Sequence, residues 1–419
     1  MKKLIKNGNV FDGHTEKLKE SAKIIIKDGI VEEILQGAVP EENFDEVIDA
    51  GNRVVMPGLV DNHVHLFSSS SEKAEGLRID ERAIRSVRVA HDVLLRGFTT
   101  VRDAGGMTFG LKKSIDSGVV VGPRIYPSNA HISQTCGNGD PRGGISAVRL
   151  PDGNYTSTIL QNQINCVADG VPEVLRAVRE QFLLGASQIK LMLSGRVDSE
   201  YSQLQTTQFS YEEIKAAVDA AQDFGTYVMA HAYSNEAVKR AVRANVKCIE
   251  HGNLLDEETA RMVADAGTWL MPALLEEHIL EYFTPVTEQA KIRVRLLQEG
   301  FHRSVELINK YHLPILYGTD LVNDMDWLAE NQLKDLVLYA RKFGNFVALK
   351  AATGNSYEIS KLTTFQNPYP RGKIGVLEEG AYADLLIVDG NPLEDIRTLA
   401  DENNIRLIMK DADIYKNTL

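Results

Sequence analysis

Two histidines separated by one residue are the first side chains in this chain that could do chemistry. His63 and His65 come at the end of an apolar run, 54–60, that predicts a buried strand. Because side chains at positions i and i+2 of a strand point to the same face, both imidazoles can reach one point. Imidazole is a good ligand for zinc and similar metals. Alternating histidines are also common on protein surfaces, so the meaning of this pair depends on further ligands downstream.

Further candidate ligands stand at or near the carboxyl ends of four later apolar runs. Each run is short, partly β-branched and bounded by turn residues or by a helical pattern, as buried strands are. The candidates are Lys190 in 189–193, His231 at the end of 227–231, His251 at the end of 246–251, and Asp320 at the end of 314–320. The segment 234–244 predicts one helix, so His231 and His251 are expected on adjacent strands.

Each of these residues also has an ordinary structural explanation. A lone lysine at a strand end most often reaches solvent, as Lys190 would. His251 could simply cap a strand, and Asp320 could be the N-cap of the next helix. The six residues together, in this order at strand ends, indicate a metal site.

The alternation of strands and helices from about 57 to 353 predicts a parallel barrel. The eight expected strands are 54–62, 98–103, 124–130, 187–193, 226–231, 246–251, 268–273 and 314–320. In such a barrel the active site lies at the carboxyl ends of the strands, where the candidate ligands stand. The stretch 132–171 is rich in Gly, Ser, Asn and Asp, and we expect it to form part of a substrate pocket or a lid.

Both ends of the chain are rich in short strand patterns, with hairpin-type turns at Asn7-Gly8 and Asp28-Gly29. Neither end is long enough to bury a core of its own. The expected fold class is therefore α/β: a (β/α)8 TIM-like barrel over residues 57–365 beside a small discontinuous β-sandwich domain. The sandwich is expected to be built from residues 1–56 and 366–419.

Composition limits the classes of partner. The 419 residues carry a net charge of −12, which argues against nucleic acid and anionic membranes. No run approaches the roughly 20 apolar residues of a membrane span, and the chain starts without a signal-peptide pattern. Three scattered cysteines, Cys136, Cys166 and Cys248, favour a reducing compartment. We therefore expect a cytoplasmic homo-oligomer that acts on a small molecule.

The chain resembles the metal-dependent amidohydrolase superfamily over nearly its whole length. The resemblance is carried by 57–65, 97–103, the Lys190 strand, His231, His251, Thr319-Asp320 and 380–389. Within the superfamily it is most similar to the prolidase-like group, which includes Xaa-Pro and Xaa-Arg dipeptidases and ochratoxin-type amide hydrolases. The resemblance implies two divalent metal ions, usually zinc, and an N6-carboxylated lysine that bridges them. By that resemblance, His63, His65 and Asp320 hold one ion, His231 and His251 hold the other, and Lys190 bridges them.

Elementary chemistry agrees with these roles. A buried lysine beside positive charge loses its proton and becomes an amine that carbon dioxide can convert to a carbamate. Two metal ions can hold a bridging hydroxide, because metal binding lowers the pKa of water to about 7. Asp320 is placed to accept a proton during attack on an amide and to deliver it to the leaving nitrogen. Tyr233 could donate a hydrogen bond to the oxyanion.

Two departures from the group's pattern affect the expected substrate. Asn138 stands where the group has a histidine in Gly-His-Gly-Asp, and an amide cannot carry charge. Arg196 stands where the group commonly has glycine. It could pair with a substrate carboxylate or remain a solvated loop residue. His131, at the end of the third expected strand, is a further candidate for substrate contact. The expected contacts are therefore His131, Asn138, Arg196 and Tyr233.

The expected reaction is hydrolysis of an amide C–N bond in an N-acyl amino acid or a dipeptide-like substrate. A cyclic amide, urea or carbamate hydrolase would use the same metal site with a different pocket. A deaminase of the superfamily usually has one metal ion and no bridging lysine, so Lys190 argues against it. Phosphotriester cleavage would be a side reaction, and a metal-binding barrel without activity is the alternative outside the enzymes.

Overall fold

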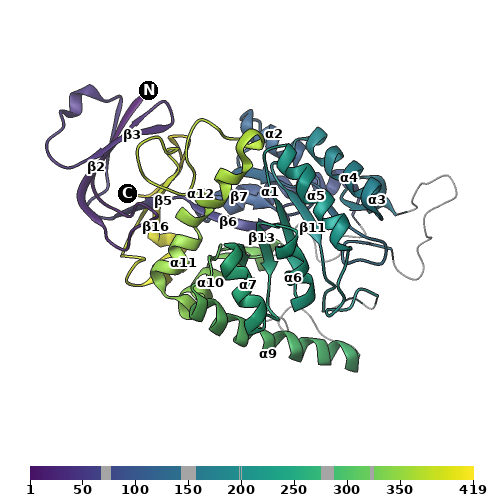
Figure 1. Ribbon diagram of the computed structural model, residues 1–419. Helices are drawn as coiled ribbons and strands as arrows, with labels where there is room; N and C mark the ends of the chain where they lie inside the picture. Colours follow the sequence, from purple (N-terminus) through teal and green to yellow (C-terminus); the bar gives the residue numbers. More distant parts are fainter. Residues whose placement is uncertain (68–76, 143–156, 198, 200, 275–286, 321–324) are drawn as a thin grey trace.

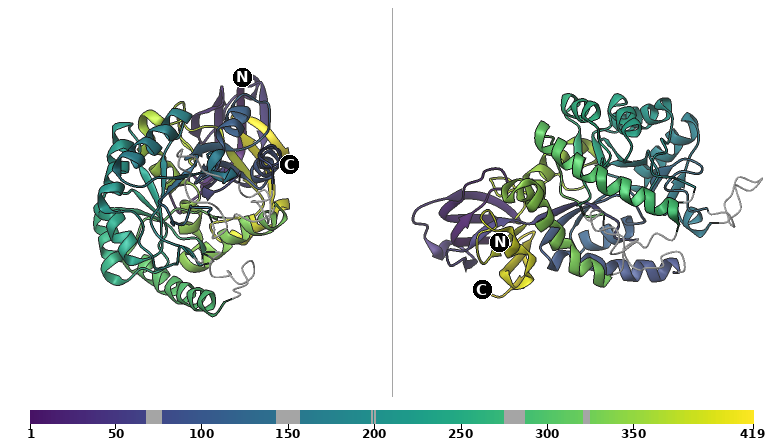
Figure 2. Two further views of the ribbon diagram at one scale, coloured as in Figure 1. Left: turned by 90° about the vertical axis from the view of Figure 1, so that its right-hand side faces the viewer. Right: turned by 90° about the horizontal axis from the view of Figure 1, so that it is seen from below.

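The computed structural model describes residues 1–67, 77–142, 157–197, 199, 201–274, 287–320 and 325–419. It has a mixed α/β fold in which three sheets are flanked by helices (Figure 1). Both termini lie at one end of the molecule, on a sheet set apart from most of the helices (Figures 1 and 2).

The sheet at that end combines strands from both ends of the chain. Its N-terminal strands are β1 (Lys2–Val10), β2 (Lys19–Lys27), β3 (Ile30–Leu35), β4 (Glu46–Asp49) and β5 (Val54–Pro57), and its C-terminal strands are β15 (Leu385–Val388), β16 (Ile405–Lys410) and β17 (Asp413–Asn417). Antiparallel pairing of β5 with β15 joins the two groups. The sheet buries its own apolar cluster, which includes Ile24, Val55 and Leu407. The two β-rich ends therefore pair with each other.

The expected strand 54–62 is wrong as a single strand. The chain leaves the end sheet after β5 and enters a parallel sheet as β6 (Leu59–Val64). Gly58 marks the crossing: its N–H donates to Asp384 O in the end sheet, whereas Leu59 N–H donates to Gly97 O in the parallel one. A Cβ on Gly58 would lie 2.1 Å from Thr99 Oγ1, so only glycine fits this crossing.

The parallel strands lie in two sheets. One contains β6, β7 (Phe98–Asp103) and β8 (Arg124–Pro127), and the other contains β9 (His131–Ser133), β10 (Asn165–Val167), β11 (Ile189–Met192), β12 (Val228–Ala232), β13 (Cys248–His251) and β14 (Trp269–Met271). The expected strand 124–130 ends early at Pro127, and His131 begins a separate strand. The expected loop 132–171 contains β10 and a short helix, and its residues 143–156 lie outside the described residues.

The expected eighth strand, 314–320, is irregular rather than a regular strand. Only Ile315 forms a bridge, to Leu270 of β14. The segment still hydrogen bonds to β6 on its other side, where Asn62 N–H donates to Tyr317 O at 2.9 Å and Asp320 N–H donates to His63 O at 2.8 Å. The positive φ of Asp320, 49°, turns the backbone out of a ladder, which explains why the strand pattern stops here.

Helices alternate with the parallel strands and cover them (Figures 1 and 2). The α-helices are α1 (Ile79–Leu95), α2 (Phe109–Asp116), α3 (Thr158–Gln161), α4 (Val171–Leu184), α5 (Tyr211–Asp223), α6 (Asn235–Arg243), α7 (Glu257–Ala266), α9 (Glu288–Tyr311), α10 (Met325–Phe343), α11 (Asn345–Ala351) and α12 (Gly354–Ser360). The 3-10 helices are η1 (Glu41–Asn43), η4 (Lys361–Gln366), η5 (Ile396–Ala400) and η6 (Glu402–Asn404).

The helix expected between His231 and His251 is present as α6. Ser234 caps it by accepting a hydrogen bond from Ala237 N–H. The strands on either side, β12 and β13, are adjacent and parallel, and His231 lies opposite Glu250 in their register. The helix therefore places the two histidines on neighbouring strands, at the carboxyl ends of both.

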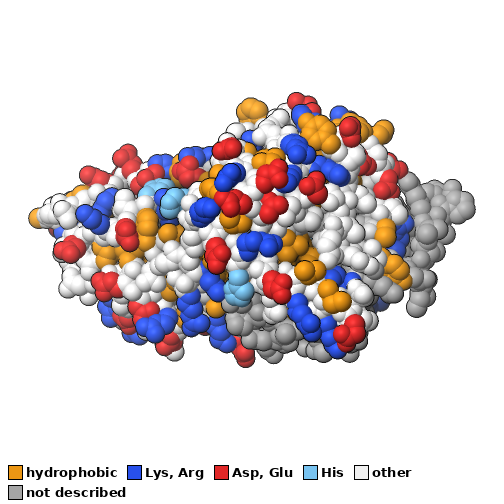
Figure 3. Space-filling view, turned by 60° about the horizontal axis from the view of Figure 1, so that its bottom comes forward, with side chains coloured by type: hydrophobic (Ala, Val, Ile, Leu, Met, Phe, Trp, Pro, Cys, Tyr) orange, Lys and Arg blue, Asp and Glu red, His pale blue; other side chains and the backbone are white. Residues whose placement is uncertain are grey.

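The surface carries charges of both signs. Figure 3 shows Lys and Arg side chains interspersed with Asp and Glu side chains over one face. In the part of the chain that the structure describes, we find no helix long and apolar enough to cross a bilayer.

A buried ion pair joins the end sheet to the parallel strands. Arg124 of β8 donates to both carboxylate oxygens of Asp384, at 2.7 and 3.2 Å, and its guanidinium lies 3.6 Å from the centre of the Tyr382 ring. Both charged side chains are at most 5% exposed. The pair therefore fixes the end sheet against the strands that carry the candidate site.

Replacing Arg124 by methionine is expected to lower the free energy of unfolding by about 3–5 kcal/mol, because the buried Asp384 carboxylate loses its partner. Urea unfolding followed by circular dichroism measures the change. Arg176→Met, which removes an exposed pair with Glu180, is the control and should lose less than about 1 kcal/mol. Equal midpoints for the two variants would contradict the assigned role of the Arg124 pair.

Candidate metal centre

The candidate ligands lie together at the carboxyl ends of the parallel strands. His63 is in β6, Lys190 in β11, His231 in β12 and His251 in β13. The ring centroids of His231 and His251 are 4.5 Å apart, and those of His63 and His251 are 5.6 Å apart. Strands distant in sequence therefore deliver four nitrogen-bearing side chains to one place.

His63, His65 and Asp320 form one potential metal site. Asp320 Oδ1 lies 3.4 Å from His63 Nε2 and 3.2 Å from His65 Nε2, and the three ligand atoms are within 4.8 Å of one another. The opposite ring nitrogens are engaged: His63 Nδ1 meets Glu250 Oε2 at 2.7 Å, and His65 Nδ1 meets Gly105 O at 3.0 Å. Because these oxygens only accept, both Nδ1 atoms carry hydrogen and both Nε2 atoms are turned toward Asp320. A cation between them fits this donor set.

Lys190 is buried beside that group. Its side chain is about as buried as His63, at 1% exposure, and its Nζ lies 3.1 Å from His63 Nε2. Burial lowers the pKa of Lys190, and the nearby Arg102 guanidinium adds to the effect against the opposing carboxylates of Glu250 and Asp320. Burial and the Lys190 charge likewise lower the pKa of His63, to about 3, so this ring is neutral. The surroundings thus make Lys190 easier to deprotonate than an exposed lysine.

His231 is oriented in the opposite sense. Its Nε2 lies 3.1 Å from Gly195 O, which only accepts, and 2.9 Å from Asn138 Nδ2, which only donates, so the two contacts require opposite tautomers. The tautomer that donates from Nε2 to Gly195 O leaves the Nδ1 lone pair of His231 for a metal ion. A Cβ on Gly195 would lie 2.0 Å from Gln203 O, so only glycine lets the backbone at 195 pass this close to Gln203. Asn138 is held in place by its own N–H, which donates to Gln208 Oε1 at 2.9 Å.

Two of the candidate ligands have a positive φ, a backbone conformation that residues other than glycine rarely adopt. The φ of His251 is 77° and that of Asp320 is 49°. Strain of this kind costs on the order of 1–3 kcal/mol and collects at functional sites. The two residues also approach each other, with His251 Nε2 3.6 Å from Asp320 Oδ2. The fold therefore holds both carboxyl-end residues in positions that regular strands would not give.

Tyr233 and His131 lie next to the candidate ligands. The Tyr233 ring stacks on His251 at 4.6 Å, and its N–H donates to Ser194 Oγ at 2.9 Å. The His131 ring centroid is 6.3 Å from that of His65. Gly105 packs directly against the His131 ring, because a Cβ at this position would lie 2.6 Å from His131 Nδ1. Burial, followed by the charges of His65, Lys190 and Arg196, holds the pKa of His131 well below its ordinary value.

Arg196 has an exposed side chain on the loop after β11, and its backbone pairs with Gln203. Its charge contributes to the lowered pKa of His131. The structure thus brings Tyr233, His131 and Asn138 against the candidate ligands and puts Arg196 toward solvent.

Sequence reasoning missed four buried charged residues that support the site: Asp61, Arg102, Asp103 and Glu250. Asp61 accepts from the backbone N–H groups of His63 and Thr319, both at 3.1 Å, and burial raises its pKa to about 6. Asp103 accepts from Leu66 N–H at 3.0 Å. A usable signal was present, because a charged residue inside a strand buried on both faces must have a partner.

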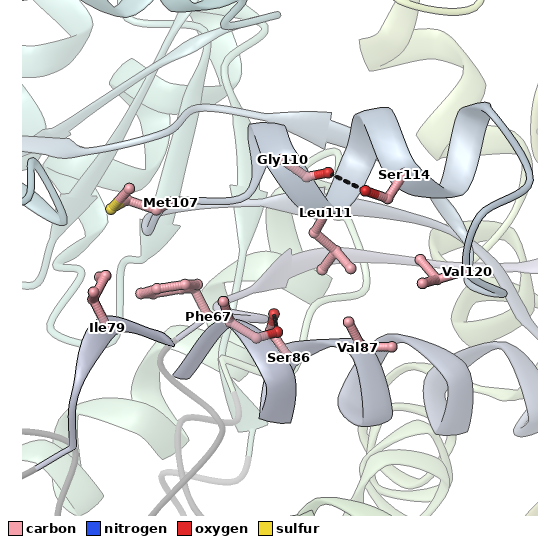
Figure 4. Close-up of a pocket in the computed structure, with 10 residues that line it drawn as sticks. Phe67, Ile79, Ser86, Val87, Met107, Gly110, Leu111, Ser114 and Val120 are labelled. Atoms are coloured by element: carbon pink, nitrogen blue, oxygen red, sulfur yellow. Dashed lines mark hydrogen bonds between the residues drawn. The ribbon is translucent and has the colours of Figure 1, made fainter. Parts of the chain in front are cut away.

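A cavity of about 290 Å³ lies between α1 and α2 (Figure 4). It is lined by Phe67, Ile79, Ala83, Ser86, Val87, Met107, Gly110, Leu111, Ser114 and Val120. Phe67 comes two residues after His65, so the cavity adjoins the candidate centre. Among the described residues that line it, none is a candidate ligand or substrate contact, and its walls are largely apolar.

Comparison with known proteins agrees with this geometry. A sequence model of the amidohydrolase family matches residues 54–415. Ochratoxinase of Aspergillus niger is 28% identical, and the match covers 99% of this chain and 86% of that protein.

Solved structures are similar over the entire chain. A prolidase complexed with N-methylphosphonate-L-proline is 35% identical with a TM-score of 0.88, and the match covers 100% of both chains. A Xaa-Pro dipeptidase with methionine bound in its active site is 30% identical with a TM-score of 0.85, again over 100% of both chains.

Proposed function

The chain belongs to the amidohydrolase family, in its prolidase-like group, and from that premise we propose a binuclear metal centre for its hydrolysis of amides. The observation that carries the proposal is the approach of His63, His65 and Asp320 to within 4.8 Å of one another, beside a buried lysine. Membership makes the chain a hydrolase of amides. The metal count, the mechanism and the substrate are the proposal.

We propose that His63, His65 and Asp320 hold one divalent ion and that His231 and His251 hold the second, with zinc as the expected metal. Lys190, N6-carboxylated, would bridge the two. Ions bound there would polarise the scissile carbonyl and make water nucleophilic near neutral pH. The tautomer of His63 supports this, because it turns the Nε2 lone pair away from the hydrogen-bonded Glu250 carboxylate.

Asp320 is the proposed general base and acid. Burial would raise its pKa, but His63 and His65 outweigh that effect and hold the pKa well below its ordinary value, so the carboxylate is ionised. It takes the proton as water attacks and gives it to the leaving nitrogen. Tyr233, stacked on His251, is proposed to donate a hydrogen bond to the developing oxyanion.

The proposed substrate is an N-acyl amino acid or a dipeptide-like amide. The names of similar proteins support this class, since they include a prolidase, a Xaa-Pro dipeptidase and ochratoxinase. His131, Asn138, Arg196 and Tyr233 are the proposed substrate contacts. Cyclic amides, ureas and carbamates are the alternative on the same site. Turnover of the zinc-loaded protein on N-acyl amino acids, dipeptides and phenylureas tests the proposal, and turnover of phenylureas alone would overturn the dipeptide-like class.

Replacing Arg196 by methionine is expected to raise KM about tenfold for substrates with a free carboxylate, because one charge-assisted contact is lost. Initial rates on an N-acyl amino acid and on its neutral amide separate this effect from general damage. Arg176→Met, on the outside of α4, is the control. An unchanged KM for the carboxylate substrate would remove Arg196 from the binding site.

For the fold we propose a closed (β/α)8 barrel over residues 57–365 and a β-sandwich domain from 1–56 and 366–419. Hydrogen bonds of the segment 315–320 to β14 on one side and β6 on the other support closure. The three cysteines are unpaired, which supports a reducing compartment such as the cytoplasm. The homo-oligomeric state stays a prediction, which light scattering would measure.

A further inference from the structure

Behind the proposed metal ligands lies a buried ion pair that none of the roles above uses. Arg102 of β7 and Glu250 of β13 have side chains 3% and 0% exposed. Arg102 Nη2 lies 2.9 Å from Glu250 Oε1 and 3.1 Å from Oε2. Removing two charges from water is costly, and the pair recovers that cost only with good geometry and further hydrogen bonds.

Arg102 is anchored on several sides. Its Nε donates to Asn62 O at 2.6 Å, and its Nη1 donates to Tyr227 OH at 3.2 Å. A guanidinium is planar and stays protonated, so contacts along different edges fix both its position and its charge. The Glu250 carboxylate is therefore held in one orientation by a cation that cannot lose its proton.

The carboxylate in turn determines which nitrogen of His63 carries hydrogen. Glu250 Oε2 lies 2.7 Å from His63 Nδ1, and a carboxylate only accepts, so Nδ1 must be the protonated nitrogen. A neutral imidazole has one N–H, which leaves the lone pair on Nε2. That atom lies 3.1 Å from Lys190 Nζ and 3.4 Å from Asp320 Oδ1. The wrong tautomer would present a hydrogen to the metal site.

We infer that Glu250, held by Arg102, is the positioning residue that fixes the ring and tautomer of His63 and so sets the metal affinity of one of the two sites. The inference rests on the proposed metal centre. His65 and His231 are oriented by neutral backbone carbonyls, those of Gly105 and Gly195. His63, by contrast, has a carboxylate on its outer nitrogen, which makes it a more basic ligand than a histidine held by a backbone carbonyl. Loss of Glu250 should therefore weaken the ion held by His63, His65 and Asp320 and spare the other.

Two variants test this with zinc and a chelator of known affinity in competition. Glu250→Gln keeps the shape and removes the charge. It is expected to bind one of the two ions about 10- to 100-fold more weakly and the other unchanged. Arg102→Met combined with Glu250→Leu removes both charges, so no buried charge is left unpaired and the fold is preserved. This double variant should show the same selective loss, and it decides the question if Glu250→Gln does not fold.

Arg124→Met is the matched control, because it breaks another buried pair that lies between sheets and outside the candidate ligands. It should lose stability while binding both ions as the wild type does. Wild-type affinity for both ions in the two Glu250 variants would overturn the inference and leave the proposed function standing. Equal weakening of both ions would reduce the pair to a structural role. A wild type that binds no zinc would overturn the proposed function and the inference with it.

Discussion

Replacing Lys190 by alanine is expected to reduce the metal content from about two ions per chain to one or fewer and to abolish turnover. The lysine is fully buried with its amine 3.1 Å from His63 Nε2, so its removal leaves the two proposed sites without a shared ligand. Burial lowers the pKa of this amine, and the neutral amine is the form that reacts with carbon dioxide. Elemental analysis after gel filtration measures the metal content.

Bicarbonate separates a carboxylated lysine from a plain one. Zinc loading of the wild type should reach about two ions per chain with bicarbonate present and fewer without it, whereas the alanine variant should not respond. Lys410→Ala is the control, since Lys410 is also buried with a lowered pKa but donates to Gly122 O, outside the candidate ligands. One ion per chain, indifferent to Lys190 and to bicarbonate, would contradict the bridge and favour a mononuclear centre of His63, His65, His231 and Asp320.

The strand periodicity of the sequence was enough to predict that the candidate ligands lie close together. His63 and His65 share a face because side chains alternate along a strand, and parallel strands end at one edge. The helix between His231 and His251 was predictable from its own local pattern. The structure places these side chains near one another, and their role as ligands stays a prediction until metal is measured.

The errors fall where distant residues decide the local structure. The apolar run 54–60 gives no sign that the chain changes sheets at Gly58, because the reason is the Thr99 side chain 41 positions away. The segment before Asp320 is likewise held by a distant residue, because Thr319 donates to the Asp61 carboxylate from its N–H and its hydroxyl. Local sequence predicts periodicity, whereas pairing between strands must be read from coordinates.

The missed charges follow the same logic. Glu250 next to His251 reads as part of a strand end, and Arg102 as one charge in an apolar run. Each becomes informative only when paired, because a buried charge requires a partner and the sequence alone does not say which strand supplies it. Treating every charged residue inside a doubly buried strand as one half of a pair would have linked Arg102 to Glu250 and pointed to His63.

Replacing Asp320 by asparagine is expected to lower kcat by about 10²–10⁴-fold, the usual contribution of a general acid–base. The amide has nearly the shape of the carboxylate but cannot take a proton, and Asp320 Oδ1 lies within 3.4 Å of both His63 Nε2 and His65 Nε2. The proposed substrate contacts are other residues, so KM should change less than kcat. Asp265→Asn, on the exposed face of α7, is the control and should match the wild type.

Metal content must be measured on the same Asp320→Asn sample, because this residue is also a proposed ligand. A variant that keeps two ions and loses kcat assigns the loss to proton transfer. A variant that loses one ion and regains activity when zinc is raised assigns it to coordination. Full activity with two ions would contradict both roles, and it would require another group to move the proton. Among the described residues, His131 is another candidate, with its ring centroid 6.3 Å from that of His65. The Asp320 carboxylate lies nearer to the proposed ligands, with Oδ1 3.2 Å from His65 Nε2, and this position is why it is the residue on which turnover should depend.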